Sequence, residues 1–289
     1  IRCSPIFELS PIILYIIAII GGMTVVVASI IALGQNDIKK IIAYSTCSQL
    51  GFMVTACGLS NYEIALSHLI NHAVFKALLF LSAGAIIHGF INEQNLNRMG
   101  YLNRLFPLLY IFILIGSCAL IGLPFMSGFY TKHLIVEIAY VKFGIQGIYV
   151  SFLLIMGSVC TNLYVMRLLV KLGLLEFNGY KNYCKMVGHI DYNMLIVLII
   201  LAFSSIFIGY IFSDMFIGLG SQIFGNAIFV LPCNWQINEY EYIPIYVKIL
   251  PLLLSMVSAV IVSIIYRPIC NLLFLKKQKK GCNFYDGLN

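Results

Sequence analysis

The chain has 289 residues, of which 61% are hydrophobic and only 10% are charged, and its formal net charge is +7. Its mean hydropathy of +0.96 lies far outside the range of a soluble globular domain. These values exclude a soluble enzyme and indicate an integral membrane protein. The apolar stretches are long enough for helical spans of about 20 residues and lack the two-residue alternation of a membrane barrel, so an all-α bundle is expected.

About seven membrane spans are predicted within a single membrane domain, residues 1–289. In chain order they cover residues 12–33, 41–58, 62–90, 106–140, 146–170, 193–213 and 246–274. The fourth is predicted to be discontinuous near Pro124, which removes a backbone donor and clashes with the preceding turn, while Gly122 and Gly128 loosen the backbone around it. Broken helices at membrane depth recur at the ion sites of transporters.

The second span carries five polar side chains within two turns, at Tyr44, Ser45, Thr46, Ser48 and Gln49. Such side chains either form hydrogen bonds between helices or line a hydrated cavity. The residue pattern leaves both interpretations open.

The third span places His68, His72 and Lys76 at positions i, i+4 and i+8. These positions share one slowly drifting helix face and rise by roughly 12 Å, at about 1.5 Å per residue. A lysine at the centre of a span costs about 2.5–3.5 kcal/mol on insertion scales, which favours a buried functional residue. The alternative is a Lys76 side chain that snorkels from a helix end. His88, at the far end of this span, is expected to be interfacial.

The basic residues are distributed unevenly between the two sides of the membrane. If seven spans alternate, one side of the membrane holds eleven basic residues and the other side holds three. The three are Arg2, Lys142 and Lys248. The eleven are Lys39, Lys40, Arg98, Arg104, Lys171, Lys181, Lys185, Lys276, Lys277, Lys279 and Lys280. By the positive-inside rule, the C-terminal tail lies on the matrix or cytoplasmic side. The same topology accounts for the net charge, so no nucleic-acid partner is expected.

Nine cysteines are scattered along the chain with no CxxC pair and no Cys/His cluster at metal spacing. They are interpreted as apolar packing residues. No metal, iron–sulfur cluster or other cofactor is predicted to bind this chain, and the absence of nucleotide and haem motifs predicts that it performs no redox chemistry.

Four stretches carry a family resemblance: QNDIKKIIAYSTCSQLGFM, HLINHAVFKALLFLSAGAIIH, NEQNLNRMG and GSCALIGLPFMSGFYTK. Together they resemble the second half of the subunit 5 family of mitochondrial NADH dehydrogenase, the distal antiporter-like membrane subunits of respiratory complex I. The specific motifs cover about residues 1–140. The resemblance implies a fold of two inverted repeats, each with a broken helix, of which this chain has most of the second.

The resemblance also implies roles for individual residues. Lys76 matches the central lysine of the family, His68 and His72 its companion histidines, and Lys132 the lysine of the second broken helix. Where the family usually has Ser-Lys-Asp, this chain has Thr131-Lys132-His133. Glu137 is then a possible counter-charge: it lies at i+4 from His133, although it cannot face Lys132 directly.

The function implied is that of a proton-translocating subunit of NADH:ubiquinone oxidoreductase in the mitochondrial inner membrane. Protons would pass through a midplane Lys/His relay, driven by quinone reduction in other chains, and NADH, FMN, iron–sulfur clusters and ubiquinone would bind in those chains. The expected partners are other complex I subunits, including the antiporter-like subunit 4 and a separate chain with the N-terminal half of subunit 5. A subunit of a cation/proton antiporter and a purely structural membrane fragment remain alternatives.

Overall fold

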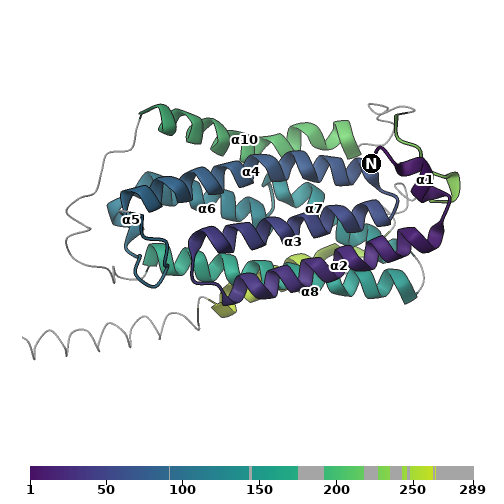
Figure 1. The fold of residues 1–289 in the computed structure, drawn as a ribbon, viewed down its shortest axis with the longest axis horizontal. Helices are drawn as coiled ribbons and strands as arrows, with labels where there is room; N and C mark the ends of the chain where they lie inside the picture. The colour runs from purple at the N-terminus through teal and green to yellow at the C-terminus, as the bar shows by residue number, and fades with distance from the viewer. Residues whose placement is uncertain are drawn as a thin grey trace, which may run out of the picture.

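The computed structural model describes residues 1–90, 92–142, 145–174, 192–217, 227–234, 243–245, 248–262 and 264. Its helices run roughly parallel to one another in an elongated bundle (Figure 1). Within these residues the β-structure is limited to one isolated bridge, between Asp37 and Asn95. The predicted all-α fold class is confirmed.

The bundle begins with a short helix and three long antiparallel helices. Helix α1 (Ser4–Glu8) precedes α2 (Pro11–Gly34), α3 (Ile38–Gly58) and α4 (Tyr62–Gly89). The described residues that follow include α5 (Leu102–Leu105), α6 (Pro107–Ile121), α7 (Ser127–Val141), α8 (Ile145–Leu169) with a π-helical end η1 (Val170–Leu174), α10 (Tyr192–Ile217) and the 3-10 turn η3 (Pro232–Asn234). A further apolar helix covers Lys248–Val262.

Five helices of the described part are long and apolar enough to cross a membrane: Pro11–Gly34, Ile38–Gly58, Tyr62–Gly89, Gly147–Gly173 and Tyr192–Phe216. At about 1.5 Å per residue, helices of this length match the hydrocarbon thickness of a bilayer. The chain is therefore a multi-pass membrane protein. The predicted spans 12–33, 41–58, 62–90, 146–170 and 193–213 lie on these five helices.

The fourth predicted span is two helices, α6 and α7, of 15 residues each, which follow one another along the bundle beside α4 (Figure 1). Helix α6 ends because Gly122 adopts a left-handed conformation, with φ of +85°, and its N–H and that of Leu123 both bond to the carbonyl of Cys118. Pro124 follows and prevents the helix from continuing. The predicted discontinuity is thus present, between Ile121 and Ser127.

Close helix packing at the break depends on Gly128, in the first turn of α7. A Cβ atom at this position would overlap the carbonyl oxygen of Ala119 in α6. The two half-helices therefore touch through their backbones, which holds the end of α6 against the start of α7.

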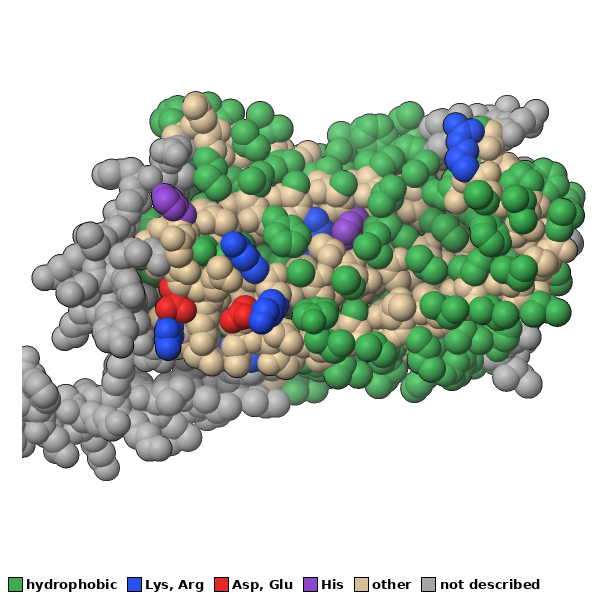
Figure 2. Space-filling view, viewed as in Figure 1, with side chains coloured by type: hydrophobic (Ala, Val, Ile, Leu, Met, Phe, Trp, Pro, Cys, Tyr) green, Lys and Arg blue, Asp and Glu red, His purple; other side chains and the backbone are tan. Residues whose placement is uncertain are grey.

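Charged and apolar side chains separate along the bundle. Figure 2 shows most of the charged side chains of this face at the end where α5 lies, and a largely hydrophobic surface elsewhere. Two ion pairs lie at that end: Lys40–Asp37, at 3.1 Å, at the start of α3, and Arg98–Glu93, at 3.3 Å, in the loop after α4. This arrangement fits a bundle whose sides face lipid and whose ends face water.

Several sequence predictions fall outside the described residues. They are the C-terminal tail with its four lysines, the seventh span beyond residue 264, and the loop lysines Lys181 and Lys185.

Candidate functional site

The ladder of His68, His72 and Lys76 lies on the buried face of α4. The exposed fractions are 0% for His68, 8% for His72 and 4% for Lys76. Lys76 sits near the middle of the 28-residue helix, so its side chain does not snorkel from an end. His88 is exposed in the last turn of the same helix, away from the ladder.

The Lys76 ammonium group is directed at α3. It donates a short hydrogen bond to Ser45 Oγ and a longer one, of 3.5 Å, to the carbonyl of Ile42. Ser45 Oγ in turn donates to the same Ile42 carbonyl at 2.7 Å. The positive charge is therefore solvated by two neutral oxygens of α3.

The two histidines extend this polar region along α4. His68 Nε2 lies 3.2 Å from Gln49 Oε1, and His68 Nδ1 lies 2.8 Å from Thr131 Oγ1. The Gln49 oxygen can only accept, so the ring donates to it through Nε2, whereas the Thr131 hydroxyl can either donate to Nδ1 or accept from it. The His72 ring is 6.3 Å from that of His68, and its Nε2 has no partner among the described residues.

The second buried lysine, Lys132 of α7, binds to the end of α6. Its side chain is 2% exposed, and the ammonium group donates to the carbonyls of Leu120 at 3.3 Å and Ile121 at 3.2 Å, and to Thr161 Oγ1 at 3.0 Å. The carbonyl end of a helix carries a partial negative charge. The broken helix thus provides a neutral anchor for a cation.

The two remaining candidates lie on either side of Lys132. His133 Nε2 is 3.0 Å from the carbonyl of Gly122, so a second α7 side chain caps the end of α6. Glu137 lines a cavity of about 300 Å³ between α7, α8 and the helix Lys248–Val262, and interacts electrostatically with Lys248.

Three hydrogen-bonding residues of the site were not among the sequence candidates. Asn71, on α4 between the histidines, donates to the carbonyl of Ser127 at 3.1 Å. Thr131 and Thr161 bond to His68 and Lys132. Asn71 lies inside a helix already rich in polar residues, and Thr161 stands close to Asn162 and Tyr164 within an apolar span. Both therefore left a signal in the sequence.

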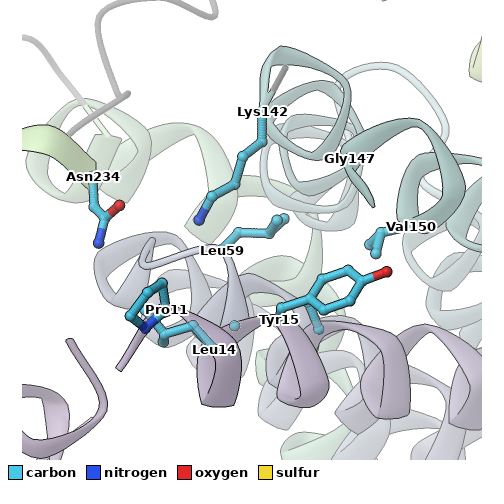
Figure 3. Close-up of a pocket in the computed structure, with 10 residues that line it drawn as sticks. Pro11, Leu14, Tyr15, Leu59, Lys142, Gly147, Val150 and Asn234 are labelled. Atoms are coloured by element: carbon cyan, nitrogen blue, oxygen red, sulfur yellow. The ribbon is translucent and has the colours of Figure 1, made fainter. Parts of the chain in front are cut away.

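A polar cluster lies apart from the lysines, at the end of the bundle near α1. Buried Glu8 accepts hydrogen bonds from Tyr62 Oη at 3.0 Å and Asn234 Nδ2 at 2.8 Å. Asn234 and Lys142 line an adjacent cavity of about 170 Å³, into which Lys142 extends beside the start of α2 (Figure 3). The cluster ties α1, α4 and η3 together.

The central site therefore consists of two buried lysines, each of which donates hydrogen bonds to neutral oxygens, with two buried histidines on α4. On α4, His72 lies between Lys76 and His68, and His68 bonds to Thr131, the residue before Lys132 on α7. Lysines and histidines gain and lose protons, and hydroxyl and amide groups can orient them.

The fold is that of antiporter-like membrane subunits. Residues 1–161, more than half of the chain, match the family described as NADH:quinone oxidoreductase/Mrp antiporter, transmembrane, and the chain belongs to this family.

Within the family, the similar curated proteins share one name. The chain is 48% identical over 289 residues to NADH-ubiquinone oxidoreductase chain 5 of Phytophthora infestans, with all of this chain and 44% of that protein aligned. It is 44% identical to chain 5 of Marchantia polymorpha, covering all of this chain and 43% of that one, and 45% identical to chain 5 of Arabidopsis thaliana, covering 89% and 39%. The chain thus spans less than half the length of these relatives.

Solved structures show the same fold. The Mrp complex from Dietzia contains a chain that superposes with a TM-score of 0.68 at 19% identity, covering 99% of this chain and 32% of that one. An archaeal membrane-bound sulfane sulfur reductase contains another, with a TM-score of 0.62 at 29% identity, covering 76% and 35%.

Proposed function

We propose that this chain is a proton-translocating membrane subunit of NADH:ubiquinone oxidoreductase, driven by quinone reduction in other subunits. The observation that carries the proposal is the pair of buried lysines, Lys76 and Lys132, whose hydrogen bonds go to neutral oxygens. A buried charge without a counter-ion is costly to maintain. A purely structural role would not need two such charges in one bundle.

In the proposed relay, a proton moves between Lys76 and Lys132 by way of His72 and His68. His68 is already bonded to Thr131, the residue before Lys132. The partnerless His72 Nε2 lies on the same helix face between His68 and Lys76, where it can exchange a proton with either through a water molecule. Glu137, beside Lys248, is a possible counter-charge at the outer edge of this path.

The alternative is a subunit of a cation/proton antiporter. The family description names both classes, and the Mrp complex shares the fold. Identities of 44–48% to chain 5 proteins favour the oxidoreductase.

The proposal includes a location and partners. By homology, the membrane is the mitochondrial inner membrane, and the basic loops at the α5 end lie on the matrix side together with the C-terminal tail. Partners are other complex I subunits, including the antiporter-like subunit 4 and a segment corresponding to the first repeat, on this or another polypeptide. NADH, FMN, iron–sulfur clusters and ubiquinone would bind in other subunits, with none held by this chain.

Two measurements test the proposal. Isolation of the native assembly through a tag on this chain should recover NADH-dependent quinone reduction, and recovery of a membrane assembly without this activity would contradict it. In the same assembly, Lys76→Ala should lower the number of protons moved per electron. An unchanged ratio would rule out a relay through Lys76.

A further inference from the structure

The aromatic ring of Phe52 lies against the ammonium group of Lys132. Lys132 Nζ is positioned over this ring, 5.6 Å from its centroid. An ammonium group within about 6 Å of a ring centroid is attracted by the negative face of the ring, most strongly where water is excluded. Water is excluded here, because Phe52 is 0% exposed and Lys132 is 2% exposed. The ring is therefore a contact of the buried cation in addition to its hydrogen bonds.

The ring completes the surroundings of the ammonium group. The three hydrogen bonds of Lys132 go to the carbonyls of Leu120 and Ile121 on α6 and to the Thr161 hydroxyl on α8. A lysine has three N–H donors, so these bonds use all of them. Phe52 approaches from α3, and the attraction of its ring acts on the charge as a whole and requires no further N–H group.

Packing holds the Phe52 ring in this position. Phe52 belongs to a buried apolar cluster that includes Ile64 of α4, Ile135 of α7 and Leu154 of α8. A side chain enclosed in a close-packed interior has few alternative orientations. The ring therefore cannot turn away from Lys132 without disturbing the contacts of several helices.

The other buried lysine has different surroundings. Among the described residues, the cations that lie over aromatic rings are Lys132, over Phe52, and Arg104, over Tyr101. Lys76 bonds to the Ser45 hydroxyl and the Ile42 carbonyl of α3. Both lysines thus donate to neutral oxygens, and the aromatic face distinguishes Lys132 from Lys76.

We propose that Phe52 is a positioning residue for Lys132, whose ring holds the ammonium form of this lysine against α3. The inference rests on the proposed function, in which Lys132 gains and loses a proton. Carbonyl and hydroxyl oxygens accept hydrogen bonds from the ammonium group and from the neutral amine alike, whereas the ring face attracts the charged form. Because the ring has no net charge, it favours that form more weakly than a carboxylate would. The cation is stabilised and its proton is still released.

A double-mutant cycle in the assembled complex tests the contact. Phe52→Leu removes the ring, and Lys132→Gln removes the charge while it keeps an N–H donor for the α6 carbonyls. The assay is thermal unfolding of the detergent-solubilised assembly. Phe52→Leu should lower the melting temperature by about 2–8 °C more in the parental chain than in the Lys132→Gln background, because only the parental chain has a cation over the ring. Equal losses in the two backgrounds would overturn the proposal.

Phe112→Leu is the matched control for the cycle. Phe112 is a buried phenylalanine of α6, and it lies nearer the start of this helix, away from the carbonyls that bind Lys132. Its replacement makes the same chemical change in another part of the core. It should therefore lower the melting temperature equally with and without Lys132→Gln. A dependence on the background as large as that of Phe52→Leu would overturn the assignment to the Phe52 ring.

Proton pumping by the complex in vesicles separates positioning from packing. Phe52→Tyr keeps the aromatic face and should pump at the parental proton-to-electron ratio, whereas Phe52→Leu should lower that ratio in fully assembled complex. A ratio in Phe52→Tyr as low as in Phe52→Leu would overturn the inference.

Lys132→Gln separates the inference from the proposed function. Loss of pumping in Lys132→Gln together with a parental ratio in Phe52→Leu would refute the inference alone. A parental ratio in Lys132→Gln would refute the place of Lys132 in the proposed relay.

Discussion

Replacing Gly128 by alanine should separate the two halves of the broken helix. The added methyl group would overlap the carbonyl oxygen of Ala119, with the carbonyl carbon at 3.1 Å. Both atoms belong to the α6 backbone, so no side-chain rotation can relieve the clash. Only a shift of α6 away from α7 can make room.

The size of the effect follows from this geometry. Overpacking of a tight interior costs roughly 1–3 kcal/mol, and each kcal/mol corresponds to about 2–4 °C in melting temperature for a domain of 150–250 residues. Gly128→Ala should therefore lower the melting temperature by about 2–12 °C. The shift should also move Leu120 and Ile121 away from Lys132, one turn further along α7, and so reduce proton pumping.

Gly84→Ala is the matched control, because a Cβ at that exposed position of α4 meets nothing within 4 Å. It should change stability by less than about 1 kcal/mol, the scale of helix propensity. The assay is thermal unfolding of the detergent-solubilised assembly, combined with pumping in vesicles. Equal melting temperatures for the two variants would refute the argument that backbone contact holds the break together.

Other substitutions test separate contacts of the site. Lys76→Ala should abolish pumping through this subunit but preserve assembly on native gels, because water can fill the gap left by the side chain and cannot replace its charge. His72→Ala should reduce pumping less, since a water molecule can substitute for the imidazole. A larger loss of pumping in His72→Ala than in Lys76→Ala would contradict the relay. Asn71→Leu should lower the free energy of unfolding by about 1–3 kcal/mol, because it leaves the Ser127 carbonyl without its donor. An unchanged melting temperature would show that this hydrogen bond does not stabilise the break between α6 and α7. Thr161→Val keeps the shape of the side chain and removes one acceptor from Lys132. It should reduce pumping with little effect on assembly. A parental proton-to-electron ratio would exclude a role for the Thr161 hydroxyl.

The sequence predicted the elements of the site better than their contacts. The ladder on α4 and the break near Pro124 were readable because helix periodicity and proline chemistry are local properties. The burial of Lys76 followed from its place at the centre of an apolar span. In the second span, where two interpretations were open, Ser45 forms a hydrogen bond with Lys76 on another helix, as the first interpretation expects. The hydrated cavity of the second interpretation stays a prediction.

The partners of Lys132 could not be predicted in the same way. They are the carbonyls at the end of α6 and the hydroxyl of Thr161 on α8. Helices that are apolar on all sides carry no sequence pattern that specifies which helices they pack against. Burial of Glu8 was also missed, because its partners Tyr62 and Asn234 lie 54 and 226 residues away in sequence. Contacts at such separations depend on how the helices assemble.

The departure from the family pattern at His133 has a physical explanation in the geometry of the break. Gly122 offers a carbonyl at the end of α6, and a carbonyl can only accept, so His133 must present its Nε2–H to it. An aspartate at this position would place acceptor against acceptor and would have to turn elsewhere. Together with the two bonds from Lys132, the histidine satisfies the carbonyls of Leu120, Ile121 and Gly122, which no longer have partners within α6. In this chain the residue beside Lys132 thus stabilises the broken helix as a donor, and the negative end of α6 faces the lysine in place of a carboxylate.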